Sequence, residues 1–132
     1  MAAQMKSDFR DLDVWKKCQD IRIIIWNLTK DFPKEEKYRL ADQMIRASRS
    51  STANIAEGYG RFHFQENIQF CRQARSSLFE LIDHVLVAEE CEYIEGKEKE
   101  RLIEHIASAI RLLNGYIRYL NKRKNDKQSG AD

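Results

Sequence analysis

Apolar residues recur at intervals of three and four along most of the chain, which is the spacing of one face of an α-helix. Turn-forming residues divide this pattern into four stretches. We expect helices over about residues 11–30, from Pro33 to Gly58, from about Phe70 to Cys91 and from about Ile103 to Lys124. No stretch alternates apolar and polar residues as a half-buried strand does, so the chain is predicted to be all-α.

The connections between these stretches are short, and short connections make consecutive helices antiparallel neighbours. The pattern predicts an up-down-up-down four-helix bundle over residues 11–124, with a flexible N-terminus at 1–10 and a disordered tail at 125–132. The apolar stripes expected to form its core are Val14, Cys18, Ile21, Ile25 and Leu28; Leu40, Met44, Ala47, Ser51 and Ile55; Phe70, Ala74, Ser77, Leu81, His84, Ala88 and Cys91, widened by Leu78, Ile82 and Val85; and Ile103, Ile106, Ile110, Leu113, Ile117 and Leu120. Such broad apolar faces favour self-association.

One segment of the second predicted helix is unusually rich in small residues. Eight of the twelve residues from Ala47 to Gly58 are small, so neighbouring helices can approach it closely and it should lie in the middle of the bundle. Asn54 and Glu57 are expected to lie beside Ile55, buried and supplied with hydrogen-bonding partners.

Composition limits the class of protein. The chain has 132 residues, 42% of them hydrophobic, which suits a single domain with one core. Its longest apolar run covers only residues 23–26, and residues 1–10 lack the apolar segment of a signal peptide. The three cysteines (Cys18, Cys71 and Cys91) lack metal-ligand spacing, which favours reduced thiols in or near the core of a cytoplasmic protein.

The net charge of +2 conceals separate basic and acidic regions. Residues 37–75 carry seven bases against three acids, residues 80–104 nine acids against three bases, and residues 111–127 six bases against one acid. This distribution suits recognition of an anionic partner, or pairing between subunits.

No catalytic or metal-binding motif is recognisable. Glu80 and His84 are four residues apart without the second copy that a di-iron bundle needs, and His84 and His105 are expected to face the core. His63 is expected to be exposed, where it could touch a ligand. Gly58-Tyr59-Gly60 follows a helix and lacks the ending of a phosphate loop. We therefore expect no enzyme, no cofactor and no metal.

The segment around Asn54-Ile55-Ala56-Glu57-Gly58, together with Gln43, Arg46, Ala47, Ser50 and Arg61, resembles the signature of the bacterial four-helix bundle family, whose members are also called 23S ribosomal RNA intervening-sequence proteins. The resemblance covers about residues 8–122. It extends to Leu12, Val14 and Trp15 near the start, to Phe32-Pro33, and to Ser77-Leu78 and Glu80-Leu81. Arg49 and Ser51 depart from it, because the family more often has apolar residues there. The residues treated as its structural signature are Gln43, Arg46, Asn54, Glu57 and Gly58.

The resemblance implies a homopentameric ring with a central channel. The stretch from Tyr59 to Arg75 is similar to one branch, the accessory variability determinants of diversity-generating retroelements. Membership of that branch would imply a reverse-transcriptase partner and nucleic-acid binding through basic surfaces.

The charge pattern supplies candidate contacts for a nucleic acid: Arg39, Arg49, Arg61, Arg72, Arg75, Arg111, Arg118, Lys122, Arg123 and Lys124. Repeated around a ring, such bases would contact many phosphates without reading base sequence. Two simpler interpretations stay open: Arg46 could pair with Glu57 inside the bundle, and the bases from Arg118 to Lys124 could merely be solvated.

The favoured function is a non-enzymatic accessory protein that holds RNA or an RNA/DNA hybrid beside a reverse transcriptase. The alternative is an oligomeric scaffold of the intervening-sequence type.

Overall fold

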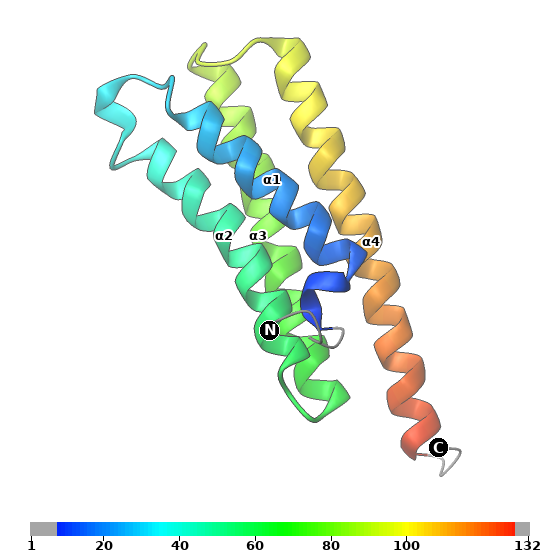
Figure 1. The fold of residues 1–132 in the computed structure, drawn as a ribbon. Coiled ribbons are helices and arrows are strands. Elements are labelled where there is room, and N and C mark those ends of the chain that lie inside the picture. The colour runs from blue at the N-terminus through cyan, green and yellow to red at the C-terminus, as the bar shows by residue number, and fades with distance from the viewer. Residues whose placement is uncertain (1–7, 129–132) are drawn as a thin grey trace, which may run out of the picture.

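The computed structural model describes residues 8–128, which form four α-helices, two short 3-10 helices and no strand. In chain order the elements are η2 (Phe9–Asp11), α1 (Asp13–Thr29), η3 (Lys34–Glu36), α2 (Leu40–Tyr59), α3 (Phe64–Glu90) and α4 (Gly96–Gln128). Consecutive α-helices run antiparallel and α4 returns beside α1, which confirms the predicted four-helix bundle (Figure 1).

We call the end with the α1–α2 and α3–α4 connections the upper end, and the end with the α2–α3 turn the lower end (Figure 1). Around the bundle the order is α1, α2, α3, α4, because contacts join each helix to its neighbours and α2 to α3 most extensively. Within residues 8–128, no helix combines the length and the apolar character needed to cross a bilayer.

The second predicted helix is interrupted before Leu40. Pro33 precedes the single turn of η3, and Arg39 has a non-helical backbone (φ −123°, ψ −109°). The carboxylate of Glu36 holds this break in place, since it accepts the Leu40 N–H at 3.2 Å and the Tyr93 hydroxyl at 2.6 Å. These two bonds lower the pKa of Glu36, the Tyr93 bond having the larger effect.

The helices are longer than predicted at three of their ends. The structure starts α3 at Phe64 and α4 at Gly96, because Ile68 and Leu102 are buried and give each added turn a core contact. At its other end α4 continues to Gln128, into the tail predicted to be disordered, and Lys124 there donates to the side chain of Gln65 at 2.8 Å.

The described part of the N-terminal segment is ordered by a capping box. Asp8 accepts the Arg10 N–H at 2.8 Å, and the Asp8 N–H donates to the Asp11 carboxylate at 3.3 Å. The predicted flexible segment therefore does not extend to residues 8–10. The rest of both predicted flexible ends, residues 1–7 and 129–132, lies outside the described residues.

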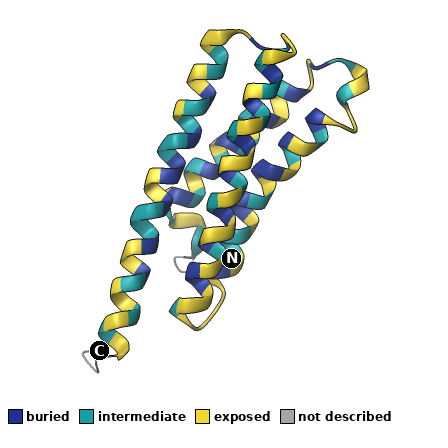
Figure 2. Cartoon of the chain, turned by 180° about the vertical axis from the view of Figure 1, so that it is seen from behind, coloured by how far each residue is buried: buried dark blue, intermediate teal, exposed yellow. Residues whose placement is uncertain are grey.

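Buried side chains follow the predicted stripes on α1, α2 and α4 closely (Figure 2). On α3 the stripe is rotated. Ile68 and Cys71 are buried, whereas Phe70 and His84 are only partly buried and Cys91 is exposed. Apolar residues lie on both sides of the buried stripe of α3, so the spacing alone did not show which of them face the core.

Five of the eight small residues from Ala47 to Gly58 are buried in the bundle, whereas Ala53 is exposed. Ser48, Ser51 and Thr52 are all less than 5% exposed. Each hydroxyl donates to the backbone carbonyl three residues earlier, at 2.7–3.0 Å. The helix thus satisfies its own buried hydroxyls, so α2 can pack against its neighbours without unpaired polar groups.

Gly58 marks a close approach of α2 and α3. A β-carbon at this position would lie 2.7 Å from Asn67 Oδ1 and 2.9 Å from Phe70 Cβ. Because Phe70 Cβ is fixed to the α3 backbone, the helix itself would have to move to make room. Gly58 is therefore required for packing, which explains its place at the end of the small-residue segment.

Gly58→Ala should destabilise the fold, whereas Gly60→Ala should not. Overpacking costs about 1–3 kcal/mol, which exceeds the roughly 1 kcal/mol that alanine gains over glycine within a helix. Gly60 is a matched control, because a β-carbon there meets nothing closer than 3.5 Å and its φ of −74° suits any residue. Urea unfolding measures both changes. Equal stability of the two variants would contradict the close approach of α2 and α3.

Candidate nucleic-acid interface

Three of the four α-helices formed by residues 8–128 reach the lower end of the bundle. Because α1 starts at Asp13, the last turns of α2 and α4 and the first turns of α3 continue past it (Figure 1). This leaves a hollow of about 290 Å³ between the α2–α3 turn and α4. Its aromatic lining residues are Tyr59, Phe62, Phe64, Tyr116 and Tyr119.

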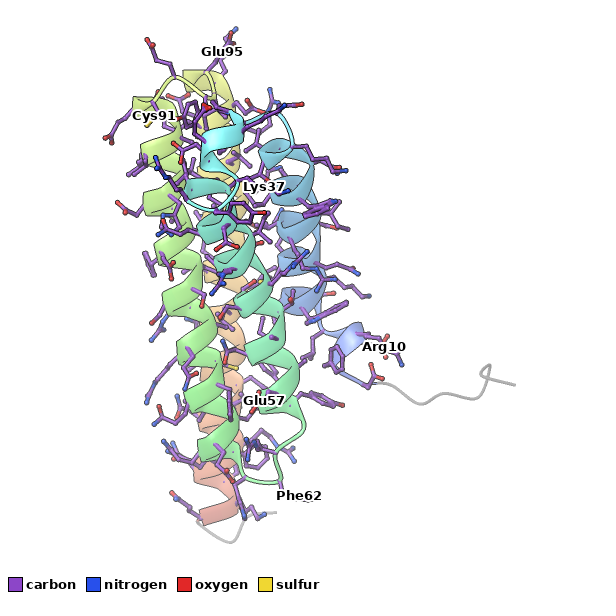
Figure 3. The ribbon with its side chains drawn as sticks, turned by 90° about the vertical axis from the view of Figure 1, so that its left-hand side faces the viewer. Arg10, Lys37, Glu57, Phe62, Cys91 and Glu95 are labelled. Carbon is purple, nitrogen blue, oxygen red and sulfur yellow. The ribbon has the colours of Figure 1, made fainter. Side chains whose placement is uncertain are left out.

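Several of these rings are open to solvent. Phe62 lies at the tip of the α2–α3 turn, where it is 96% exposed (Figure 3). Tyr119 is 55% exposed and stacks on Tyr116, with ring centroids 6.2 Å apart. A hydrogen bond orients the Tyr116 ring, because Asn67 of α3 donates to its hydroxyl at 3.3 Å. We call the five rings that line the hollow the aromatic platform, and three of them are exposed at the lower end: Tyr59, Phe62 and Tyr119.

The predicted bases of α3 and α4 come together beside this platform. Two hydrogen bonds place the helices side by side: Arg75 Nη1 donates to Asn114 Oδ1 at 2.7 Å, and Lys124 Nζ donates to Gln65 Oε1 at 2.8 Å. Both acceptors are neutral, so neither bond cancels the positive charge. The resulting basic surface consists of Arg72, Arg75, Arg118, Lys122, Arg123 and Lys124.

None of these six bases forms an ion pair with the described residues. Arg72, Arg118 and Lys122 are exposed, and the Arg123 guanidinium lies 5.9 Å from the centre of the Phe64 ring. A cation over an aromatic face is held in orientation while it keeps its charge. The basic surface therefore stays positive and borders the aromatic platform.

The other four candidate bases are separate from this surface. Arg61 pairs with Glu57 at 3.1 Å and Glu66 at 3.6 Å, and Arg111 pairs with Glu104 at 2.8 Å, so their charges are balanced. The remaining two candidates lie in the upper half of the bundle; they are Arg39, at the start of α2, and Arg49, over the Trp26 ring at 5.5 Å.

Two signature residues differ from their predicted positions. The Glu57 side chain is 56% exposed and bonds Arg61 instead of lying in the core. The reason is geometric: residues two apart are about 200° apart around a helix, so Glu57 cannot share the buried side with Ile55. Gly58 takes that side. Asn54 is half-buried and donates to Ser50 O at 2.9 Å and Ser50 Oγ at 3.0 Å, within its own helix.

The other two signature residues lie on the surface of α2. Gln43 is exposed, and Arg46 pairs with Asp42 at 3.0 Å rather than with Glu57. Both residues of that ion pair are substantially exposed, so the pair adds little stability.

Each histidine of the chain has a different setting in the structure. His84 contacts Glu80 at 2.9 Å, His105 contacts Lys17 at 3.0 Å, and His63 is exposed beside the hollow, as predicted. Among the described residues, no three histidines, cysteines or acids are grouped closely enough to hold a metal ion.

Sequence reasoning missed the aromatic platform. The signal was present in the run from Tyr59 to Phe64, where three aromatic residues flank Gly60 and Arg61. Aromatic residues concentrated in a short turn have no core to enter, which could have identified them as exposed.

Comparison with known proteins agrees with the four-helix fold. A model of the 23S rRNA-intervening sequence protein family matches residues 10–115. The chain belongs to this family, as the signature around Asn54 indicated.

The bundle is also similar to a crystal structure of a protein of unknown function from the S23 ribosomal protein family of Bacteroides thetaiotaomicron. The TM-score is 0.74 at 24% identity, over 80% of this chain and 95% of that one. At this identity the likeness shows the shared fold. No curated protein matches the sequence significantly.

The three cysteines differ sharply in their environments. Cys18 and Cys71 have no exposed surface, and burial raises the pKa of Cys18 to about 11 and that of Cys71 to about 12. Cys91 is exposed where α3 ends, at the upper end of the bundle (Figure 3). The prediction of core thiols therefore holds for two of the three.

A thiol reagent at pH 8 should modify one cysteine rapidly in the native protein and all three in denaturant. The thiolate is the reactive form, and a raised pKa lowers its fraction in Cys18 and Cys71 while burial also excludes the reagent. Cys91→Ser should abolish the fast phase. A fast phase that persists in this variant would show that the core of the bundle opens readily.

Proposed function

We propose that this protein is a non-enzymatic nucleic-acid-binding protein that uses its lower end to hold an unpaired strand. The observation that carries the proposal is the group of six bases without acidic partners beside exposed aromatic rings. Proteins that bind single strands combine these two elements, since the bases follow the phosphates and the rings stack on the nucleobases.

The arrangement of the bases favours contact with a backbone. Arg118 and Lys122 are one turn apart on the exposed side of α4, and Arg72 lies on the neighbouring α3. Such a surface neutralises successive phosphates and does not depend on base identity. Phe62, at the tip of the turn, supplies a ring on which an unpaired base can stack.

Self-association into a ring is the second part of the proposal. A closed oligomer would repeat the basic surface and multiply its phosphate contacts. A pentamer and a reverse-transcriptase partner follow from the sequence resemblance alone and stay predictions. The family assignment fits the intervening-sequence type of scaffold better than the retroelement branch, so a partner of that kind is not needed for the proposed binding.

Neutralising the basic surface should weaken nucleic-acid binding and flatten its dependence on salt. The variant combines Arg118→Gln, Lys122→Gln, Arg123→Gln and Lys124→Gln. If all four bases contact phosphates of a single strand, the slope of log K against log salt should fall in magnitude by about three. Filter binding between about 50 and 200 mM salt measures it.

A matched control removes the same charge from the upper half of the bundle: Arg46→Gln, Lys97→Gln, Lys99→Gln and Arg101→Gln. Its salt slope should equal that of the wild type. Undetectable binding by the wild type at low salt would contradict the proposal and favour a scaffold that binds proteins. Equal loss in both variants would instead indicate non-specific attraction to the whole surface.

Phe62→Ala should weaken binding of a single strand and leave duplex binding unchanged. Loss of one stacked base costs about 1–3 kcal/mol, or roughly 5- to 150-fold in affinity. Because Phe62 is almost fully exposed, the substitution should not alter the melting temperature. Fluorescence anisotropy with a strand and its own duplex measures both affinities. A parallel loss for duplex, or no loss for the strand, would remove the stacking role.

A further inference from the structure

An apolar groove with a positive rim lies between α1 and α2 in the upper half of the bundle. It encloses about 440 Å³, and a smaller hollow of about 210 Å³ adjoins it and shares Trp26, Ile45 and Arg49. Trp26 is 47% exposed and Tyr38 is 82% exposed. The apolar lining residues are Trp26, Phe32, Pro33, Tyr38, Ala41 and Ile45.

Cations surround these rings. Lys30 and Arg49 both lie over the Trp26 ring, at 5.4 and 5.5 Å, and Lys37 lies 5.4 Å from the centre of the Tyr38 ring. Lys34 lines the same groove. None of the four forms an ion pair with the described residues, and the only acid in the lining, Asp42, is paired with Arg46. The groove is therefore both apolar and positively charged.

A stripe that is also apolar, but negatively charged, runs along the upper half of α3. Phe79, Asp83, Leu86 and Glu90 follow one another at intervals of four and three, so they share one side of the helix. All four are exposed, and neither Asp83 nor Glu90 forms an ion pair with the described residues. The two apolar side chains are seven residues apart, or about 10 Å along the helix.

The groove and the stripe lie at the same height along the bundle. The hydrogen bond between Ser50 and Ser77, at 2.9 Å, marks the lower limit of both, since Arg49 lies just above Ser50 and Phe79 just above Ser77. The ring contact between Phe32 and Tyr93, with centroids 5.2 Å apart, marks the upper limit. The groove and the stripe are therefore similar in length and opposite in charge.

They cannot meet within one molecule. Phe79 and Leu86 follow Arg75 by four and eleven residues, so the stripe lies on the side of α3 where Arg75 bonds α4, away from α2. The groove opens between α1 and α2. Because the helices are ordered α1, α2, α3, α4 around the bundle, the two surfaces are on opposite faces.

We propose that the α3 stripe of one copy docks into the α1–α2 groove of the next. Phe79 and Leu86 would fill the apolar groove, while Asp83 and Glu90 meet the cations on its rim. Such a contact is heterologous, joining different surfaces of two identical chains, and it generates a ring when the rotation between copies closes. The equal height of both surfaces keeps successive copies level, as a ring with its axis along the helices requires.

This inference deepens the self-association part of the proposed function and does not depend on nucleic-acid binding, which uses the lower end. Two double variants test it. Asp83→Lys with Glu90→Lys reverses the stripe, and Lys30→Glu with Lys37→Glu reverses the rim of the groove. Asp20→Lys with Glu100→Lys is the control for the stripe reversal, because it makes the same charge change elsewhere on the surface. Both residues are exposed acids that form no ion pair with the described residues.

Light scattering should give a multiple of 15.6 kDa for the wild type and the control, and the monomer mass for each reversed variant. Combining both reversals in one chain should restore the oligomer, since the charges again attract. Circular dichroism establishes that each variant is folded.

The outcomes separate the two proposals. A monomeric wild type would overturn the ring and the interface together. An oligomer that survives either reversal, or a combined variant that stays monomeric while folded, would overturn this interface and leave the ring standing. Salt-dependent nucleic-acid binding by the monomeric variants is expected to persist through the lower end, and its loss would show that the basic surface acts only within the assembly.

Discussion

The close approach of α2 and α3 is the contact on which the other features depend. It requires side chains that occupy little space, and Ser50 meets this condition, since it accepts the Ser77 hydroxyl of α3 at 2.9 Å. Gly58 then allows the backbones to meet just before the turn. Once the two helices are fixed in this way, the turn between them can only project outward, and it carries Phe62 into solvent.

The periodicity of apolar residues was sufficient to predict the helices and the bundle, because burial of one side is the dominant force on each helix. It was insufficient where two sides of a helix are apolar, as on α3, and at helix ends, where single contacts decide. Glu36 ends one helical turn and caps the next through its bonds to Leu40 and Tyr93. The bond between Glu36 and Tyr93 joins residues 57 positions apart, so it leaves no local signal in the sequence.

Charge counts located the basic segments of the candidate site but could not say which bases stay unpaired. Arg61 and Arg75 count equally in a sum of charges. Arg61, however, pairs with two carboxylates, whereas Arg75 bonds a neutral amide. Arg61 lies in the α2–α3 turn within reach of carboxylates four residues before and five residues after it, whereas Arg75 faces Asn114 of α4. The aromatic platform depends even more on tertiary structure, because it is exposed only where α1 is too short to cover it.

Leu120 is the last buried residue of α4, so the final two turns of this helix have no core to hold them. Helical turns without packing are only marginally stable, and the like charges of Arg123 and Lys127, one turn apart, oppose their formation. A bound polyanion would relieve that repulsion and stabilise the end of the helix. Part of its measured affinity would then be the free energy of local folding, and amide hydrogen exchange in this segment would slow when the strand binds. The end of α4 would therefore act as a short element whose order depends on its ligand.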